Sequence, residues 1–292
     1  MEKHLLLTVG DSRQVSAPLH FIGNFFSNHC DVRLTLLYVV TMGMHMKLEE
    51  YDKSTEAQED KAIVAGREAK GRKALAEAKE WIVRGGCEEQ KIHTKVVYSA
   101  EGISPAIVVE ARKGLYDAVF LGRRGLTWFE EIIEDSVSRE ILWGDIDFPV
   151  WCCRRTDLMA RDNVLLCVLG NEADRRMADH VGFMLEGEER HKVTLFHVSR
   201  DEVGTEELEA LVAPHRSELV RNGFPEERVE VKSVRAGNVE KAIVGEAESG
   251  RYAVVALGRQ KNEPSGIKRI FPDSISGRLL RMIEYSCIWI SK

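Results

Sequence analysis

Three features of the sequence could carry chemistry: a methionine-rich run, a pair of adjacent cysteines and several glycine-containing loops. The run 42–46, Met-Gly-Met-His-Met, offers thioethers and an imidazole, which are soft ligands suited to Cu(I). Methionine also fills irregular apolar gaps, so a packing segment near the mouth of a cleft explains the run without a metal. We predict packing here and no metal site.

The cysteines show no C-x-x-C motif and no regular spacing. They are Cys30, Cys87, Cys152, Cys153, Cys167 and Cys287. Neighbouring residues on a strand point to opposite faces, so Cys152 and Cys153 are predicted to be buried as small apolar residues and not to form a redox pair. In a chain of this size, reduced thiols in a cytoplasm are expected rather than a disulfide framework.

Motifs typical of enzymes are missing from the sequence. It contains no G-x-S-x-G nucleophile elbow and no H-E-x-x-H zinc pattern, and neither an HIGH-like nor an SGGxDS loop for adenylyl transfer. The stretch 66–73 has the glycine spacing of a phosphate loop, but Arg72 stands where lysine is required. The stretch also lies inside a segment that is predicted to be helical. We predict no catalytic residues and a protein that is not an enzyme.

The composition excludes further classes of protein function. The 292 residues include 41 Lys and Arg against 47 Asp and Glu, which gives a net charge of −6. A phosphate backbone needs clustered cations, so nucleic acid is not an expected partner. No apolar run approaches the ~18–20 residues that cross a bilayer, and the first apolar stretch is too short for a secretion signal. We expect a cytoplasmic, globular protein without a membrane partner.

The chain repeats itself. Residues 106–123 and 242–259 are identical at eleven of eighteen positions with a constant offset of 136, and 34–39 aligns with 193–198 at an offset of 159. A period this long indicates a duplicated domain, with about twenty extra residues between the second and third strands of the first copy. The predicted domains are 1–156 and 160–292.

Short apolar runs alternate with amphipathic stretches in both copies. The predicted strands are 5–9, 32–40, 92–98, 118–121 and 149–153, then 164–169, 193–198, 229–234, 253–257 and 287–290. The predicted helices of the first copy are 15–28, 55–83, 104–113 and 135–142, of which 55–83 is extended and largely exposed. This order predicts α/β domains with parallel sheets, whose ligand sites lie beyond the carboxyl ends of the strands. It draws attention to Asp11, Val39 and the loop after Leu121.

That loop carries a family resemblance. Leu121-Gly122-Arg123-Arg124-Gly125, nine residues and then Asp135-Ser136-Val137-Ser138 resemble the G-x2-G-x9-G-[S/T] loop of universal stress proteins, in an arrangement similar to the two-domain members. The resemblance implies two doubly wound five-stranded parallel sheets in the order 3-2-1-4-5, related by a pseudo-twofold. It also implies pairing of the two domains through their fifth strands, where Trp151 and Trp289 would suit the contact or simply lie in the core.

The resemblance further implies an ATP or AMP site in the first copy. Matched position by position, the cofactor-binding residues would be Asp11, Val39, Leu121, Gly122, Arg124, Gly125, Ser136, Val137 and Ser138. Asp135 replaces the third glycine, however, and its carboxylate would repel phosphate and act as a helix N-cap. The second copy departs further, because its loop lacks the second glycine and Gly170-Asn171 replaces Gly10-Asp11.

The function predicted from the sequence is that of a non-catalytic stress-adaptation or regulatory module with clefts derived from an ATP site. The first copy would retain weak adenine-nucleotide binding. The alternative is a scaffold with degenerate clefts that binds a protein partner, or another copy of itself, through its sheet edges and long helix.

Overall fold

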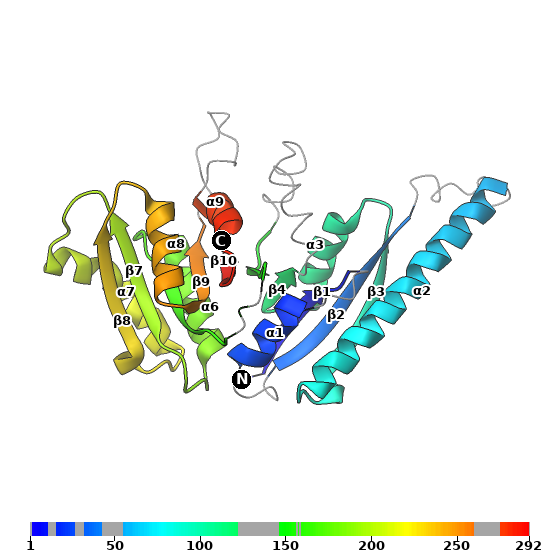
Figure 1. The fold of residues 1–292 in the computed structure, drawn as a ribbon, viewed down its shortest axis with the longest axis horizontal. Helices are drawn as coiled ribbons and strands as arrows, with labels where there is room; N and C mark the ends of the chain where they lie inside the picture. Colours follow the sequence, from blue (N-terminus) through cyan, green and yellow to red (C-terminus); the bar gives the residue numbers. More distant parts are fainter. Residues whose placement is uncertain are drawn as a thin grey trace.

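A continuous sheet forms the middle of the molecule. The computed structural model describes residues 2–10, 16–26, 32–42, 55–121, 146–155, 157, 159–259 and 275–291. Over these residues ten strands pair in the order β3-β2-β1-β4-β5-β10-β9-β6-β7-β8 (Figure 1). They are β1 (Lys3–Thr8), β2 (Val32–Thr41), β3 (Ile92–Ser99), β4 (Ala118–Leu121), β5 (Val150–Cys152), β6 (Asp162–Cys167), β7 (Val193–Ser199), β8 (Val229–Arg235), β9 (Tyr252–Gly258) and β10 (Cys287–Ser291). Each half runs 3-2-1-4-5 from its edge to the middle with parallel neighbours, which confirms the predicted fold class.

Helices cover both faces of the sheet. The described helices are α1 (Ser16–Phe25), α2 (Thr55–Arg84), α3 (Ile103–Gly114), α6 (Glu172–Leu185), α7 (Thr205–Arg221), α8 (Val239–Ser249) and α9 (Ile275–Met282), with short 3₁₀ turns η4 (Glu89–Lys91) and η5 (Glu226–Arg228). Buried side chains of α1, α2, α6 and α7 belong to one core, and those of α3, α8 and α9 belong to the other. On β1, Leu5 and Leu7 enter the first core while Leu6 enters the second. Because both faces are buried, the strands are almost wholly apolar.

The two halves match at the level of strand register. Leu5 pairs with Ala118 in the first half, and Val164 pairs with Val254 in the second, at the offsets of 159 and 136 found in the sequence. The connection from β2 to β3 is the longer one, because it carries the 30-residue helix α2 where the second half has the 17-residue α7. The predicted helix 135–142 and residues 43–46 of the methionine-rich run lie outside the described residues.

A partly buried polar network is present in both halves. In each, a glutamate on a covering helix accepts hydrogen bonds from a lysine on the edge strand and from a tyrosine hydroxyl at distances of 2.6–3.4 Å; the groups are Glu110, Lys95 and Tyr116, and Glu246, Lys232 and Tyr252. Burial raises the pKa of Tyr116 to about 12 and also raises that of Tyr252. Both glutamates and both tyrosines belong to the identities between residues 106–123 and 242–259, so part of that identity maintains this network.

The halves join through an antiparallel contact between β5 and β10. Trp151 lies opposite Trp289 in the register, and their rings stack with centroids 4.1 Å apart and planes 4° apart. Both side chains are fully buried. From the sequence, these tryptophans could belong to the contact between the domains or to an ordinary core. Both interpretations are correct, because the core that buries them is the contact between the halves.

Helix α1 of the first half reaches across this seam. Its Phe25 ring stacks on His191 of the second half at 4.2 Å, and His191 Nε2 donates to the Phe25 carbonyl at 2.7 Å. Arg190 donates to the same carbonyl at 3.2 Å. A cation at the carboxyl end of a helix is favourable, so the second half stabilises the end of α1 as well as its aromatic face.

The seam is not symmetric in its polar contacts. Trp151 Nε1 donates to His180 Nε2 on α6 at 3.0 Å. The 159-residue offset places Phe21 at the corresponding position of α1, and its ring meets Trp289 edge-on at 6.4 Å. Among the described residues, Trp289 Nε1 has no nitrogen or oxygen acceptor.

Helix α2 lies close against β2 through small residues. Its buried face includes Gly71, Ala74 and Ala78, and Gly71 sits directly over the Tyr38 ring. Gly66, one and a half turns earlier, is exposed, and a Cβ atom added there would meet no other part of the chain within 4 Å. Both glycines therefore lie inside a helix, as the sequence predicted, and of the two only Gly71 marks a close approach to the sheet. In the described part of the chain, no helix combines the length and the apolar character needed to span a membrane.

Substitution of these two glycines by alanine should have opposite effects on stability. A methyl group at Gly71 would overlap the buried Tyr38 ring, and we expect Gly71→Ala to lower the free energy of unfolding by about 1–3 kcal/mol. Gly66→Ala should raise it by about 0.5–1 kcal/mol, because alanine is the better helix former. Urea unfolding of both variants measures the difference, and equal effects would contradict this packing.

His180 should make stability depend on pH. Burial lowers its pKa from 6.5 to about 3, so below pH 6.5 the unfolded chain binds a proton that the folded chain does not. Stability is therefore lost as the pH falls, by about 2 kcal/mol between pH 8 and pH 5 for this residue. His180→Gln keeps an acceptor for Trp151 without the titration, so its unfolding free energy should fall less over this range than that of the wild type. Parallel pH profiles for the two proteins would refute the assignment.

Candidate functional site

The carboxyl ends of β1, β2 and β4 meet where the strand order reverses, which is the expected place for a ligand in this fold. Val9 continues the β1 ladder, since its N–H donates to the Leu37 carbonyl at 2.8 Å. Thr8 Oγ1 reaches the Phe120 carbonyl on β4 at 3.5 Å. These bonds hold the ends of β1, β2 and β4 at the same level.

A small recess opens at these strand ends. It has a volume of about 20 Å³ and is lined by Thr8, Val9, Leu37, Tyr38, Val39, Ile103 and Ile107. Five of these seven residues are aliphatic, and the other two, Thr8 and Tyr38, carry hydroxyl groups. A space of this size holds a water molecule or two. Apolar walls suit the flat face of a ring better than a charged group.

Two of the predicted site residues lie within the described residues, and they differ. Val39 is half-buried and lines the recess. Leu121 is fully buried in the core beneath α3 and is not part of the lining. The other predicted residues lie outside the described residues: Asp11, Gly122, Arg124, Gly125, Ser136, Val137 and Ser138, together with Asp135.

Helix α3 supplies a wall that was not predicted from the sequence. Ile103 and Ile107 stand one turn apart at its start and face the recess. Their i, i+4 spacing marked an apolar helix face, but spacing does not say which part of the sheet that face covers. Gly102 precedes α3 at φ 103°, a conformation that favours glycine, and its first turn has no side-chain cap.

A cation from α2 also lies at this end of the sheet. Arg67 Nη1 donates to the carbonyl and the hydroxyl of Thr41, at 2.7 and 3.1 Å, where β2 ends. The next residue, Met42, donates its N–H to the Ser99 carbonyl at 2.8 Å and so begins the methionine-rich run beside β3. Within the described ranges, no group of three or more His, Cys, Asp or Glu side chains is placed to hold a metal ion.

The corresponding turn of the second half is occupied by its own polar groups. Asn171 caps α6 by accepting from the N–H groups of Ala173 and Asp174 at 2.9 and 3.1 Å. Asp174 Oδ2 in return accepts from Leu169 N–H and Asn171 N–H, which completes a capping box. Asp174 is almost fully buried, and burial raises its pKa. Asn171, which stands where the first copy has Asp11, thus serves to start a helix.

The β9 strand closes this turn from the other side. Gly258, at the end of β9, lies against the backbone of Ala173 and Asp174 so closely that a Cβ atom would overlap them. His197, at the end of β7, bonds the Val168 carbonyl through Nδ1 at 2.8 Å. The first turn of α6 is therefore packed and hydrogen-bonded within the chain.

Comparisons with known proteins agree with the resemblance seen in the sequence. The model of the universal stress protein family matches residues 1–154, which confirms the predicted family. A universal stress protein from Archaeoglobus fulgidus DSM 4304 is similar over 99% of this chain and 96% of its own, with a TM-score of 0.66 and 18% identity.

Two further solved structures are similar. A putative universal stress protein from Pseudomonas aeruginosa UCBPP-PA14 covers 100% of this chain and 93% of its own, with a TM-score of 0.52 and 14% identity. A universal stress protein family protein from Arabidopsis thaliana, solved with AMP bound, covers 53% of this chain and 92% of its own, with a TM-score of 0.34 and 17% identity. No curated protein matches the sequence.

Removal of the Asn171 cap should cost stability. Asn171→Ala leaves two N–H groups of α6 without their acceptor, and we expect the free energy of unfolding to fall by about 1 kcal/mol. Asn171→Ser keeps an oxygen in reach and should lose much less. Chemical denaturation of both variants measures the cap, and equal losses would show that the amide is not acting as one.

Proposed function

Because the chain belongs to the universal stress protein family, we propose that it is a non-catalytic stress-adaptation or regulatory module whose first half binds an adenine nucleotide. The observation that carries this proposal is the apolar recess at the strand-order reversal of the first half. Recognition there would set the conformation or the partner affinity of the chain rather than drive a reaction.

The recess supports the base end of such a ligand. Val39 and Ile103 provide aliphatic surface, and Val9 lines the recess at the end of β1. A volume of about 20 Å³ admits part of a ring at most, so a nucleobase would lie across the opening and displace water. In this proposal Asp11 contacts the adenosine end, and Gly122, Arg124, Gly125, Ser136, Val137 and Ser138 surround the phosphates.

Charge argues for weak binding of a triphosphate. Asp135 occupies the position of a phosphate-approaching glycine, with Glu130, Glu131 and Glu134 close in sequence. Two like charges ~4 Å apart repel by about 1 kcal/mol in water and by several times that in a partly buried cleft. AMP would meet less of this repulsion than ATP, since it has fewer phosphates to place.

We extend the proposal to the organisation of the chain. Domains 1–156 and 160–292 would pair through β5 and β10, in place of two subunits that pair in a dimer. The strand order supports this division, because it runs inward from β3 and from β8 and meets between β5 and β10. Further association with a second copy would then use a different surface.

A scaffold without a nucleotide is the second candidate, and the second half favours it. There the helix start is capped by Asn171 and Asp174, and Gly258 packs against it. Such a half would offer its outer surface and sheet edge to a protein partner while its cleft stays filled by its own groups.

Calorimetric titration with AMP, ADP and ATP, each with magnesium, distinguishes the two candidates. We expect saturable binding to the wild type that is lost in Asp11→Ala and Gly125→Ala. Asp135→Gly should raise the affinity for ATP on the order of fivefold or more, because it removes repulsion from the terminal phosphates. The affinity for AMP should rise less.

Asn171→Ala is the matched control, since it alters the corresponding turn of the second half and should leave the titrations unchanged. No heat of binding with any nucleotide at millimolar concentration would reject the nucleotide site and leave the scaffold. Binding that survives Asp11→Ala and Gly125→Ala would place the nucleotide elsewhere.

A further inference from the structure

Two cysteines from different halves face each other across the seam. The β5–β10 register pairs Val150 with Ile290, Trp151 with Trp289 and Cys152 with Ile288. Continued by one residue, the same antiparallel register places Cys153 opposite Cys287. The two residues are distant in sequence and are brought together only by the pairing of the halves.

The side chains of this pair point to the same face of the sheet. Cys153 and Cys287 belong to the core that holds the stacked tryptophans, whereas Cys152 and Ile288 belong to the opposite core. Burial, and after it the neighbouring Cys153 thiol, raises the pKa of the Cys287 thiol. The Cys153 thiol itself donates to the Arg155 carbonyl at 3.5 Å. Adjacent cysteines on β5 are thus separated by the sheet, and the cysteine opposite Cys153 comes from β10.

The backbone geometry of this pair suits a covalent bond. Opposed residues of an antiparallel pair have Cα atoms about 4.5 or 5.5 Å apart. Disulfides are formed at Cα separations of about 4.4–6.8 Å, so no rearrangement of the strands is required.

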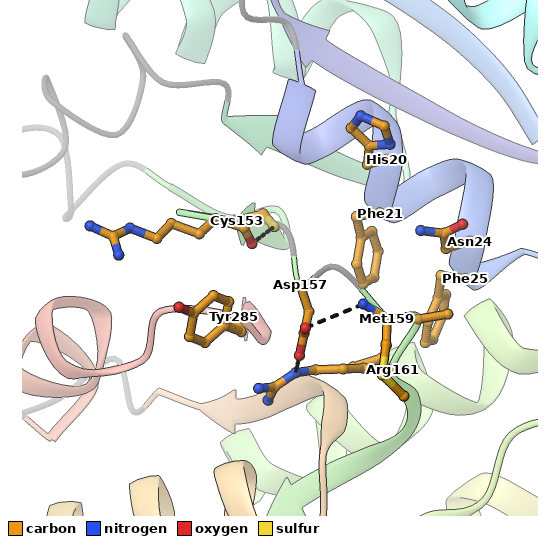
Figure 2. A pocket seen from close by; sticks show the side chains of 12 residues that line it. His20, Phe21, Asn24, Phe25, Cys153, Asp157, Met159, Arg161 and Tyr285 are labelled. Atoms are coloured by element: carbon orange, nitrogen blue, oxygen red, sulfur yellow. Dashed lines mark hydrogen bonds and ion pairs between the residues drawn. The ribbon is translucent and has the colours of Figure 1, made fainter.

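One of the two thiols borders a cavity. Cys153 lines a space of about 40 Å³ at the seam, together with Phe21 of α1 and with Asp157 and Arg161 from the segment that joins the halves (Figure 2). The volume is enough for a few water molecules and hence for a small peroxide. Cys287 is fully buried and does not line this space, and burial with the neighbouring Cys153 thiol raises its pKa. An entering oxidant therefore meets Cys153 first.

We propose that Cys153 and Cys287 are a redox modification site that forms a reversible disulfide between the two halves of the chain when a hydroperoxide is the oxidant. The peroxide oxygen accepts the electron pair of Cys153 Sγ, the O–O bond breaks, and water or an alcohol leaves, which gives a sulfenic acid. Cys287 Sγ attacks that sulfur, the S–O bond breaks, and the hydroxide departs with the Cys287 proton as water. One peroxide is reduced for each dithiol oxidised, and a thiol reductant reverses the bond by exchange.

The bond would fix the seam covalently. It would connect the end of β5 with the start of β10, beside the Trp151–Trp289 stack. A cross-link between residues this far apart in sequence restricts the unfolded chain strongly. We therefore expect the oxidised protein to unfold at a higher urea concentration than the reduced protein, and dithiothreitol to return the midpoint to its starting value.

The test is treatment of the folded, full-length wild type with hydrogen peroxide, followed by intact mass and peptide mapping without reductant. We expect a mass loss of two hydrogens, and a peptide containing Cys287 linked to the peptide that contains Cys152 and Cys153. Fragmentation of the linked peptides should place the bond at Cys153, so the assignment does not depend on any variant folding.

Variants supply the matched comparison. The bond should be absent in Cys153→Ser and Cys287→Ser and retained in Cys152→Ser, whose sulfur lies on the other face. Circular dichroism establishes that each variant is folded. A wild type that keeps both hydrogens after peroxide treatment overturns the proposal. So does a bond mapped to Cys152, or one that forms after unfolding but not in the folded chain.

Discussion

The antiparallel contact between β5 and β10 is the interaction on which the architecture depends. It turns two five-stranded sheets into one and leaves no exposed edge between them. Three residue pairs alone make a short ladder, so the side chains must supply most of the stabilisation. Two fully buried indole rings, stacked at 4.1 Å, each contribute on the order of 4–6 kcal/mol of apolar burial. Helix α1 adds to this by placing Phe25 against His191 and by offering its last carbonyls to the second half.

Duplication has preserved some interactions and changed others. The glutamate–tyrosine–lysine network is the same in both halves, and it lies away from the carboxyl ends of the central strands. At those ends the halves differ: the first has a recess with aliphatic walls, and the second has the Asn171–Asp174 capping box. At the seam, His180 accepts a hydrogen bond from Trp151 Nε1, while Phe21 stands in the matching place beside Trp289. Identity between the copies therefore follows the demands of the fold more closely than those of a shared ligand.

The sequence predicted the architecture well for physical reasons. A sheet buried on both faces needs continuous apolar strands, and these runs were recognisable from their composition, as were the helices between them. The limits of α2 agree with the prediction to within a residue, because its charge pattern continues along its whole length. Leu121 and the wall formed by Ile103 and Ile107 were less predictable. Which face of a strand or helix meets the cleft depends on how α3 lies on the sheet, and no local pattern contains that information.

The amino-acid sequence by itself determined the duplication, the alternation of strands and helices, the strand order implied by the family resemblance and the equivalence of Trp151 with Trp289. These follow from periodicity and from identity at a constant offset, which are properties of the chain read in one dimension. Tertiary structure decided that the two tryptophans stack, that Cys153 lies opposite Cys287 while Cys152 faces away, and that Asn171 starts a helix. These contacts depend on the pairing of two distant strands and on the docking of helices onto the sheet. Each of these contacts depends on the packing and hydrogen bonding of many residues, and it exists only once the chain has folded.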